Sequence, residues 1–386
     1  MTAAALIYLD YAATTPLDPR VAERMREVQS SAYFNPASNH VAGRQSARIV
    51  AEAAADLGAL LNVEPASIIW TSGATESNNL AILGAAKQRA HRGRHLVTMR
   101  TEHKAVVDVF RALEKAGFDV TWLTPGPDGQ LNLETFEAAL RDDTQLVSIM
   151  QINNETGIVQ DIEAIGRICR SRKILFHVDA AQAVGKVPVD VSALQVDLMS
   201  MTAHKFYGPK GIGALYVARG TALEPQMFGG GQQMRLRPGT LPVDLIAGLG
   251  AAAAVAVHRI DDDLENLVML KERLWSGIRS IEGVSLNGSV RGTYPGILNV
   301  SIADIEGESL LLALEPLCVA TGSACNSQSQ EPSYVLRALG RSDQEAQSAI
   351  RFSLGRQSSK EDIDFAISAY RSAVRKLRSL APGVAA

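Results

Sequence analysis

Between residues 61 and 217, short runs rich in apolar and β-branched residues alternate with longer amphipathic segments. The runs read as strands and are SIIWTSG, HLVTMR, FDVTWL, LVSIM, ILFHVDA, VDLMSM and GALYV. Strands that alternate with helices are typical of an α/β fold, with a mainly parallel sheet covered by helices on both faces. Ligands bind such sheets where strands end and loops lead into helices, so we expect the chemistry just after these runs.

The pattern changes after an Ala-rich helical stretch that ends near residue 257 and leads into a charged amphipathic one. Beyond it, GVSLNG, GILNVSI and CVATGSAC predict strands, while EPSYVLRALG and SKEDIDFAISAYRSAVRKLRSL predict helices. The 386 residues exceed the roughly 250 to 300 at which a single core stops growing. We therefore predict a large domain of residues 15–250 and a small domain of residues 1–14 and 251–386.

Charge and hydropathy narrow the classes of function. The net charge is −3 and the pI is near 6.2, with Lys and Arg scattered among Asp and Glu, so we expect no direct nucleic-acid partner. The N-terminal apolar run has no basic residue before it, unlike a signal peptide. The longest apolar run, residues 245–257, falls short of the ~20 residues of a membrane span, so we expect a cytoplasmic protein.

The three cysteines are odd in number and lack the CxxC spacing of zinc or redox sites, so neither a disulfide framework nor a metal site is predicted. Cys169 and Cys318 lie in apolar segments and are expected in the core. Cys325 differs, because it lies in the polar stretch ATGSACNSQSQEPS, residues 320–333, and no apolar neighbour anchors it. It is the cysteine with a predicted chemical role.

A lysine follows one of the predicted strands. VDLMSM leads into TAHKFYGPKGIGALYV, where Lys205 comes after Thr202 and His204 and before a glycine-rich turn. A lysine between two buried strands has the position expected of a Schiff-base lysine, although most loop lysines are merely solvated. Asp179 ends another strand and would suit as the anion beside the ring nitrogen of pyridoxal phosphate, or else as a helix N-cap; Gln182 would donate to the ring's phenolic oxygen.

Two further strand ends carry polar residues. TSGATESNN, residues 71–79, joins a strand to a helix and offers small hydroxylated residues and a helix N-terminus to a phosphate, although it would also serve as a capping segment. TEHKAV places His103 at the next strand end, where an imidazole would stack on the cofactor ring and shuttle protons, or would be structural.

Together, these motifs resemble the pyridoxal-phosphate cysteine desulfurases of the NifS and IscS kind, within the class V aminotransferases. The resemblance extends over nearly the whole chain, through YLDYAATTPLDPRV, NPASNHVAG, TSGATESNNLAI, TEHKAV, INNETGIVQDI, HVDAAQAVGK, AHKFYGPKGIGALY, GTLPV, TGSACNS, EPSYVLRALG and IRFSLGR. It implies the fold of aspartate aminotransferase-like, pyridoxal-phosphate-dependent transferases.

The resemblance also implies roles for particular residues. Lys205 would carry the cofactor, Asp179 and Gln182 would contact its ring, and His103 would stack on it. The phosphate would be held by Ala74, Thr75, Thr202 and His204, and by Thr240 reaching across a homodimer interface. Asn154 and Arg351 would bind the substrate carboxylate, Arg351 as a bidentate clamp.

Cys325 matches the family's persulfide-forming cysteine. The implied reaction converts L-cysteine into L-alanine and leaves the sulfur on Cys325 for a protein acceptor, which requires the loop of residues 320–333 to move. The chain ends at LAPGVAA without the C-terminal extension by which IscS-like members engage a scaffold protein, so the acceptor stays open among iron-sulfur cluster assembly, nitrogenase maturation and tRNA or DNA thiolation.

Other readings stay open at this point. A selenocysteine lyase or an aminotransferase would use the same fold and cofactor. A non-catalytic dimer that only binds partners would not need the lysine, the aspartate and the cysteine. A cofactor-free thiol hydrolase built on Cys325 would leave Lys205 and Asp179 unexplained.

Overall fold

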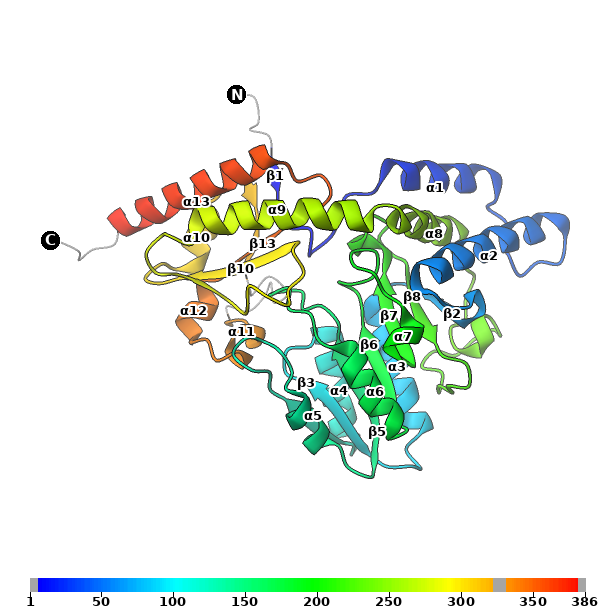
Figure 1. Cartoon of the computed structure of the whole chain (residues 1–386). Coiled ribbons are helices and arrows are strands. Elements are labelled where there is room, and N and C mark those ends of the chain that lie inside the picture. The colour runs from blue at the N-terminus through cyan, green and yellow to red at the C-terminus, as the bar shows by residue number, and fades with distance from the viewer. Residues whose placement is uncertain (1–5, 322–330, 381–386) are drawn as a thin grey trace.

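The structure is a computed structural model that describes residues 6–321 and 331–380 (Figure 1). Its helices are α1 Pro19–Ser31, α2 Val41–Leu61, α3 Ala74–Gln88, α4 Lys104–Lys115, α5 Leu133–Ala139, α6 Ile162–Ser171, α7 Val191–Leu194, α8 Val243–Val257, α9 Ile260–Ile278, α10 Gly307–Ala313, α11 Tyr334–Ala338, α12 Asp343–Gln347 and α13 Lys360–Leu380. Short 3-10 helices are η1 Pro65–Ser67, η2 Ala203–Lys205 and η3 Gln233–Arg235. Its strands are β1 Ile7–Tyr8, β2 Ile68–Thr71, β3 His95–Met99, β4 Asp119–Leu123, β5 Thr144–Met150, β6 Leu175–Asp179, β7 Leu198–Thr202, β8 Gly213–Val217, β9 Val284–Leu286, β10 Ile297–Ile302, β11 Leu317–Cys318, β12 Ala320–Thr321 and β13 Ile350–Ser353.

The seven predicted strands form one sheet, in the order β2-β8-β7-β6-β5-β3-β4. The run from β7 to β4 is parallel, and β8 is antiparallel to both β2 and β7. The α/β fold with a mainly parallel sheet is therefore confirmed.

Both faces of this sheet are buried, which explains why its strands are nearly continuous apolar runs. Side chains alternate along each strand: Leu96 faces the cluster formed with α3 and α4, and Val97 faces the cluster that includes α6. Leu198 and Met199 divide between the same two clusters on β7. Figure 1 shows α6 in front of the sheet and α3 and α4 behind it.

The rest of the chain forms two smaller sheets and long helices. The predicted C-terminal strands lie in an antiparallel sheet of order β12-β13-β10-β9 and in a parallel pair, β1 with β11. The N-terminal residues thus pair with the C-terminal part, as expected. Helix α8 packs on α1 and α2, and α9 packs on α13 (Figure 1). The predicted boundary at residue 250 falls inside α8, and the division into two domains stays a prediction.

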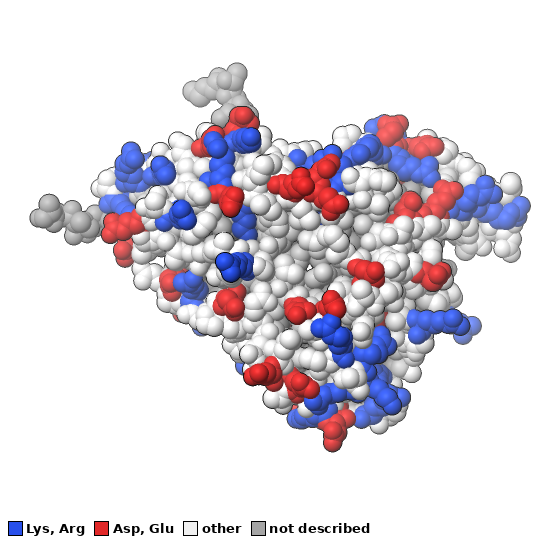
Figure 2. Space-filling model, viewed as in Figure 1, with Lys and Arg blue, Asp and Glu red and all other residues white. Residues whose placement is uncertain are grey.

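Among the described residues, no single helix is both long enough and apolar enough to cross a membrane. Helices α8 and α9 meet the length and composition requirement only as a pair, and they are bent by 70°. On the face shown in Figure 2, Lys and Arg side chains are interspersed with Asp and Glu.

Candidate active site

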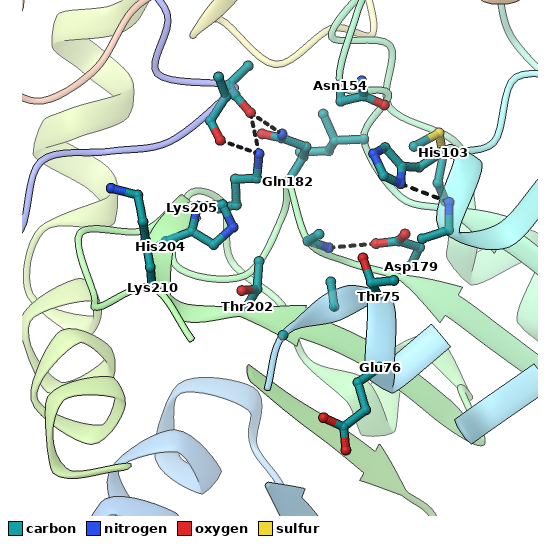
Figure 3. Close-up of a pocket in the computed structure, with 18 of the residues that line it drawn as sticks. Thr75, Glu76, His103, Asn154, Asp179, Gln182, Thr202, His204, Lys205 and Lys210 are labelled. Carbon is teal, nitrogen blue, oxygen red and sulfur yellow. Dashed lines mark hydrogen bonds between the residues drawn. The ribbon is translucent and has the colours of Figure 1, made fainter. Parts of the chain in front are cut away.

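A cavity of about 630 Å³ lies where the parallel strands end (Figure 3). The N-terminal end of α3 and three residues of the N-terminal segment, Asp10, Ala12 and Ala13, complete its wall. Ten of the residues predicted from the sequence line it: Ala74, Thr75, His103, Asn154, Asp179, Gln182, Thr202, His204, Lys205 and Arg351. These ten residues therefore share one cavity, and their catalytic and binding roles stay predictions.

Lys205 ends η2, directly after β7, and its amine reaches the N-terminal segment. Nζ donates to the carbonyl oxygens of Ala12 at 2.7 Å and Ala13 at 2.6 Å (Figure 3). The side chain is half-buried. Backbone carbonyls therefore hold the Lys205 amine in the cavity. This excludes the interpretation of Lys205 as a loop lysine that only contacts solvent.

Asp179 ends β6 and is 4% exposed. Its Oδ2 accepts from Asn78 Nδ2 at 2.7 Å, and its Oδ1 accepts from the backbone N–H of Ala181 at 3.0 Å. The second bond caps the turn of residues 181–186 that follows the strand; no helix begins there, so the helix N-cap interpretation is wrong. Asn78 was missed, although it lies four residues after Ala74 on α3 and thus on the same helix face.

His103 caps α4, because its Nδ1 accepts from the backbone N–H of Ala105 at 3.1 Å. Burial lowers the pKa of His103, nearby Asp179 raises it, and Lys205 lowers it again. The ring is therefore neutral at pH 7, and since Nδ1 accepts, its proton lies on Nε2. This histidine is both a structural cap and a cavity residue.

The turn before α3 has the features of an anion cradle. Gly73 adopts a φ of +156° at the N-cap and offers no side-chain acceptor, so the first N–H groups of α3 are left without a cap. A Cβ at Gly213 would approach the Cα of Gly73 to 2.6 Å, so only glycine allows this turn to lie against β8. Together with the hydroxyls of Thr75 and Thr202, this cradle suits a phosphate.

His204 lies beside this cradle and pairs with Thr14 through Nδ1 and Oγ1 at 3.1 Å. Burial lowers the pKa of His204 to about 4, and the neighbouring Lys205 adds to the shift. His204 is therefore neutral at pH 7.

Gln182 lines the cavity, but one of its amide N–H groups is already engaged. Nε2 donates to the carbonyl of Ala12 at 2.8 Å, and Oε1 accepts from Lys186 Nζ at 2.5 Å. An amide nitrogen carries two N–H groups, so a second donor is left for a ligand. Burial lowers the pKa of Lys186 well below the usual lysine range. Lys186 was not predicted as a site residue, although it ends the motif HVDAAQAVGK.

Arg351 lies on β13 and joins the cavity from the C-terminal part of the chain. Its Nη2 pairs with Asp10 Oδ1 at 2.6 Å, and its Nη1 donates to the carbonyl of Asn154 at 2.9 Å. Within the described residues, the buried Nε–H has no hydrogen-bond partner. A buried donor without an acceptor fits a site for a carboxylate. Asp10 was missed as a site residue, although it interrupts the apolar N-terminal run.

Comparisons with known proteins agree with this geometry. The family model of class-V aminotransferases matches residues 7–365. A protein of Aeromonas hydrophila subsp. hydrophila called cysteine desulfurase IscS is 54% identical over 381 residues, which cover 97% of this chain and 94% of that one. The chain belongs to the cysteine desulfurase branch of the class-V aminotransferase family. The resemblance predicted from the motifs is thereby confirmed.

Solved structures of cysteine desulfurase relatives share the fold. A NifS-like protein superposes with a TM-score of 0.91 at 34% identity, covering 97% of this chain and 100% of that one. A structure described as SspA in complex with cysteine has a TM-score of 0.81 at 38% identity and covers 91% of this chain and 99% of that one.

Two residues that the resemblance assigns to this desulfurase site lie elsewhere or outside the described residues. Thr240 is exposed and lies in a separate depression beside Tyr33 and Phe34, so within one chain it does not reach the cavity. Cys325 lies outside the described residues. The roles assigned to both stay predictions.

The other two cysteines of the chain, Cys169 and Cys318, lie among the residues that the structure describes. Cys169 is fully buried, and burial raises the pKa of its thiol, as expected for a core cysteine. Cys318 is only half-buried, so its placement in the core was wrong. It lies on the two-residue strand β11, in a sheet whose second strand is β1.

Glu155, next to Asn154, was also missed, and it gives the desulfurase fold a pH-dependent stability. Burial raises its pKa from 4.5 to about 7, although Ser333, Arg351 and Lys104 act in the opposite direction. Between these pH values the unfolded chain has lost the proton that the folded chain still holds, so the free energy of unfolding falls as pH rises.

We expect Glu155→Gln to remove this loss, so that the variant gains about 3 kcal/mol relative to wild type between pH 5 and pH 8. Urea unfolding of both proteins at the two pH values measures it. Glu345→Gln is the control: hydrogen bonds from Ser342 lower the pKa of Glu345 from 4.5, so its effect on the pH dependence of stability lies at lower pH, and the difference from wild type should stay nearly constant between pH 5 and pH 8. An unchanged difference between wild type and Glu155→Gln would contradict the prediction.

Proposed function

We propose that this chain is a pyridoxal-phosphate-dependent cysteine desulfurase, which converts L-cysteine into L-alanine and keeps the sulfur as a persulfide on Cys325. One observation carries the proposal. A single cavity brings together the amine of Lys205, the carboxylate of Asp179, an uncapped helix N-terminus and the guanidinium of Arg351.

The donor set fits pyridoxal phosphate. The N–H groups of Ala74 and Thr75, with Thr202 and His204, would hold the phosphate. The carboxylate of Asp179 would pair with the protonated ring nitrogen, and Lys205 would carry the group. When bound, this cofactor supplies an electron sink for the charge that develops at the substrate Cα. His103 and Gln182 would contact its ring from the cavity wall.

The chain's own residues orient the substrate and move its protons. Arg351 and Asn154 bind the carboxylate of L-cysteine, and the buried Nε–H of Arg351 gains its acceptor there. Lys205 Nζ takes the proton from Cα. His103 carries its proton on Nε2 when neutral, so it first donates that proton to the reacting group, and the freed Nε2 then accepts the proton of the substrate thiol.

Sulfur transfer is assigned to Cys325 on the sequence. Its thiolate bonds to the sulfur of bound L-cysteine as the C–S bond breaks, and the electron pair of that bond stays with the three-carbon product. The sum is L-cysteine plus Cys325–SH giving L-alanine plus Cys325–S–SH. Because the relative of known structure called SspA holds cysteine, L-cysteine is the proposed substrate here.

A homodimer belongs to the same proposal. Large apolar side chains are exposed on this chain, among them Tyr33 and Val41 at 75% and Phe228 at 87%. Thr240 lies in the same depression as Tyr33. Apolar side chains that lie together on a surface favour a protein partner, and Tyr33 and Phe34 lie in the depression that Thr240 also lines. A second copy over this depression is proposed, with Thr240 reaching the partner's cavity as the resemblance implies.

The sulfur acceptor is proposed to be a protein. The relatives named IscS favour a scaffold of iron-sulfur cluster assembly, and another thiolation pathway is the alternative. The cytoplasmic location stays a prediction from the sequence.

Replacing the sulfur-accepting thiol tests the proposal. With pyridoxal phosphate, L-cysteine and dithiothreitol, which reduces the persulfide to thiol and sulfide, the wild type should be yellow and form alanine and sulfide. Cys325→Ser should keep the absorbance changes that L-cysteine causes and lose sulfide release by about 100-fold or more, because no thiolate accepts the sulfur. Cys318→Ser is the matched control and should retain the wild-type rate.

A colourless protein that pyridoxal phosphate does not stabilise would refute the cofactor. Sulfide release unaffected by Cys325→Ser would keep the fold and cofactor and refute the persulfide. L-selenocysteine in the same assay separates the alternative: a selenocysteine lyase would release selenide and leave L-cysteine unchanged.

A further inference from the structure

The two ends of the chain segment between Thr321 and Ser333 are attached beside the two residues proposed to bind the substrate carboxylate. At the upstream end, β12 pairs with β13, and Ala320 is the register partner of Arg351. At the downstream end, Ser333 Oγ donates to Glu155 Oε2 at 2.5 Å. Glu155 follows Asn154 in the chain, so each anchor lies next to one member of the carboxylate-binding pair.

The loop that carries Glu155 is itself fixed. The backbone N–H of Glu155 donates to Asn153 Oδ1 at 2.9 Å, and its carbonyl accepts from Asn299 Nδ2 at 3.0 Å. Asn299 lies on β10 and is the register partner of Arg351 on β13. These hydrogen bonds fix the backbone of Glu155. The contact between its carboxyl and Ser333 therefore fixes the position of the first residue of α11.

Helix α11 is attached to the active-site loops by more than this bond. Ser333 is its N-cap, since Oγ accepts from the backbone N–H of Leu336 at 3.2 Å. Val335 packs with Ile158 in a small buried cluster. Tyr334 donates from its hydroxyl to the carbonyl of Glu102 at 2.7 Å, and Glu102 precedes His103.

Capping and packing would hold α11 without an acidic partner. Burying a carboxyl costs folding free energy, and Glu155 is only 4% exposed. Ser342, the N-cap of α12, pairs with an acidic residue of its own helix near the surface, Glu345. Ser333 instead pairs with a buried carboxyl 178 residues away in the chain. The position of Glu155 between Asn154 and Ser333 points to a role in the reaction.

We propose that Glu155 is a positioning residue for sulfur transfer. By holding Ser333 beside Asn154, it fixes the point from which the chain carrying Cys325 is attached, relative to the carboxylate of the bound substrate. Cys325 precedes Ser333 by eight residues, a reach of ~27 Å at most, so the position of this anchor limits the region that the thiol can reach. The inference rests on the proposed function, because Cys325 is the sulfur acceptor there.

Removing the hydroxyl of Ser333 from the cofactor-loaded enzyme tests whether Glu155 positions the segment through this contact. We expect Ser333→Ala to lower the single-turnover rate of alanine formation about 10-fold while KM for L-cysteine stays within about twofold, because substrate binding does not use this contact. Ser333→Thr keeps the hydroxyl, and Glu155→Gln keeps an acceptor for it. Both single variants should therefore keep most of the wild-type rate of alanine formation. Ser342→Ala, the matched loss of an N-cap at α12, should lower stability alone.

A second readout does not depend on desulfurase activity. Mass spectrometry measures how fast iodoacetamide modifies Cys325, with Cys318 in the same chain as reference. Release of the downstream anchor in Ser333→Ala should raise the modification rate of Cys325 about threefold or more, and Ser342→Ala should not change it.

The outcomes separate the two proposals. Faster alkylation with a slower transfer step supports the positioning role. The positioning role is overturned if Ser333→Ala shows wild-type rates of both Cys325 alkylation and alanine formation. It is also overturned if KM for L-cysteine rises by as much as the rate of alanine formation falls. A wild-type enzyme that forms no alanine refutes the proposed function, and the alkylation rates then still decide whether Glu155 anchors the segment.

Discussion

Lys205→Ala is expected to lower kcat/KM for alanine formation from L-cysteine by about 10³-fold or more. The amine is the group that would carry the cofactor and take the proton from Cα, and no other lysine amine donates to the carbonyls of Ala12 and Ala13 within the described residues. Steady-state assays of alanine and sulfide, on protein reconstituted with pyridoxal phosphate, measure the loss.

Lys271→Ala is the matched control for this substitution. Lys271 is also a partly buried lysine that donates to a hydroxyl and a carbonyl, those of Thr293 and Tyr294, but it does not line the cavity. Burial lowers the pKa of Lys271 to about 8. Its substitution should cost stability and leave kcat/KM within about twofold. A Lys205→Ala enzyme that keeps a tenth of wild-type activity would contradict the assignment.

Much of the fold could be predicted because the hydrophobic pattern of each segment agrees with the burial of that segment in the folded protein. The strand of Val97 and its neighbours reads as an apolar run because both faces of the sheet are buried. The antiparallel direction of β8 could not be read from the pattern, since an apolar run has no sign of direction. The two-residue strand β11 was placed in the core because its flanking residues are apolar, yet a two-stranded sheet leaves Cys318 half-exposed.

The site could be predicted where its residues follow strands directly. Lys205, Asp179 and His103 each come at a strand end, and parallel strands bring such ends to one edge. Asn78 and Glu155 were missed because their roles depend on partners distant in the chain: Asn78 contacts Asp179 across 101 residues, and Glu155 contacts Ser333 across 178. A single sequence carries no pattern for such pairs.

Arg351→Lys is expected to raise KM for L-cysteine by about 10-fold to 100-fold, with a smaller fall in kcat. One N–H of Nη2 donates to Asp10 and one N–H of Nη1 donates to the carbonyl of Asn154, so the buried Nε–H and the second N–H of each Nη are left for the substrate. Lysine would keep the charge near Asp10 and lose the forked donors that match a carboxylate. Initial rates over a range of L-cysteine concentrations separate the two constants.

Arg341→Lys serves as the control, since Arg341 pairs with Glu345 at 3.1 Å and lies outside the cavity lining. It should change neither constant by more than about twofold. If Arg351→Lys lowered kcat and kept KM, the arginine would act on the chemical step and not on the carboxylate. Cysteamine, which lacks the carboxylate, gives the complementary test: wild type and Arg351→Lys should use it equally poorly, because the substrate then has no group for the guanidinium to bind.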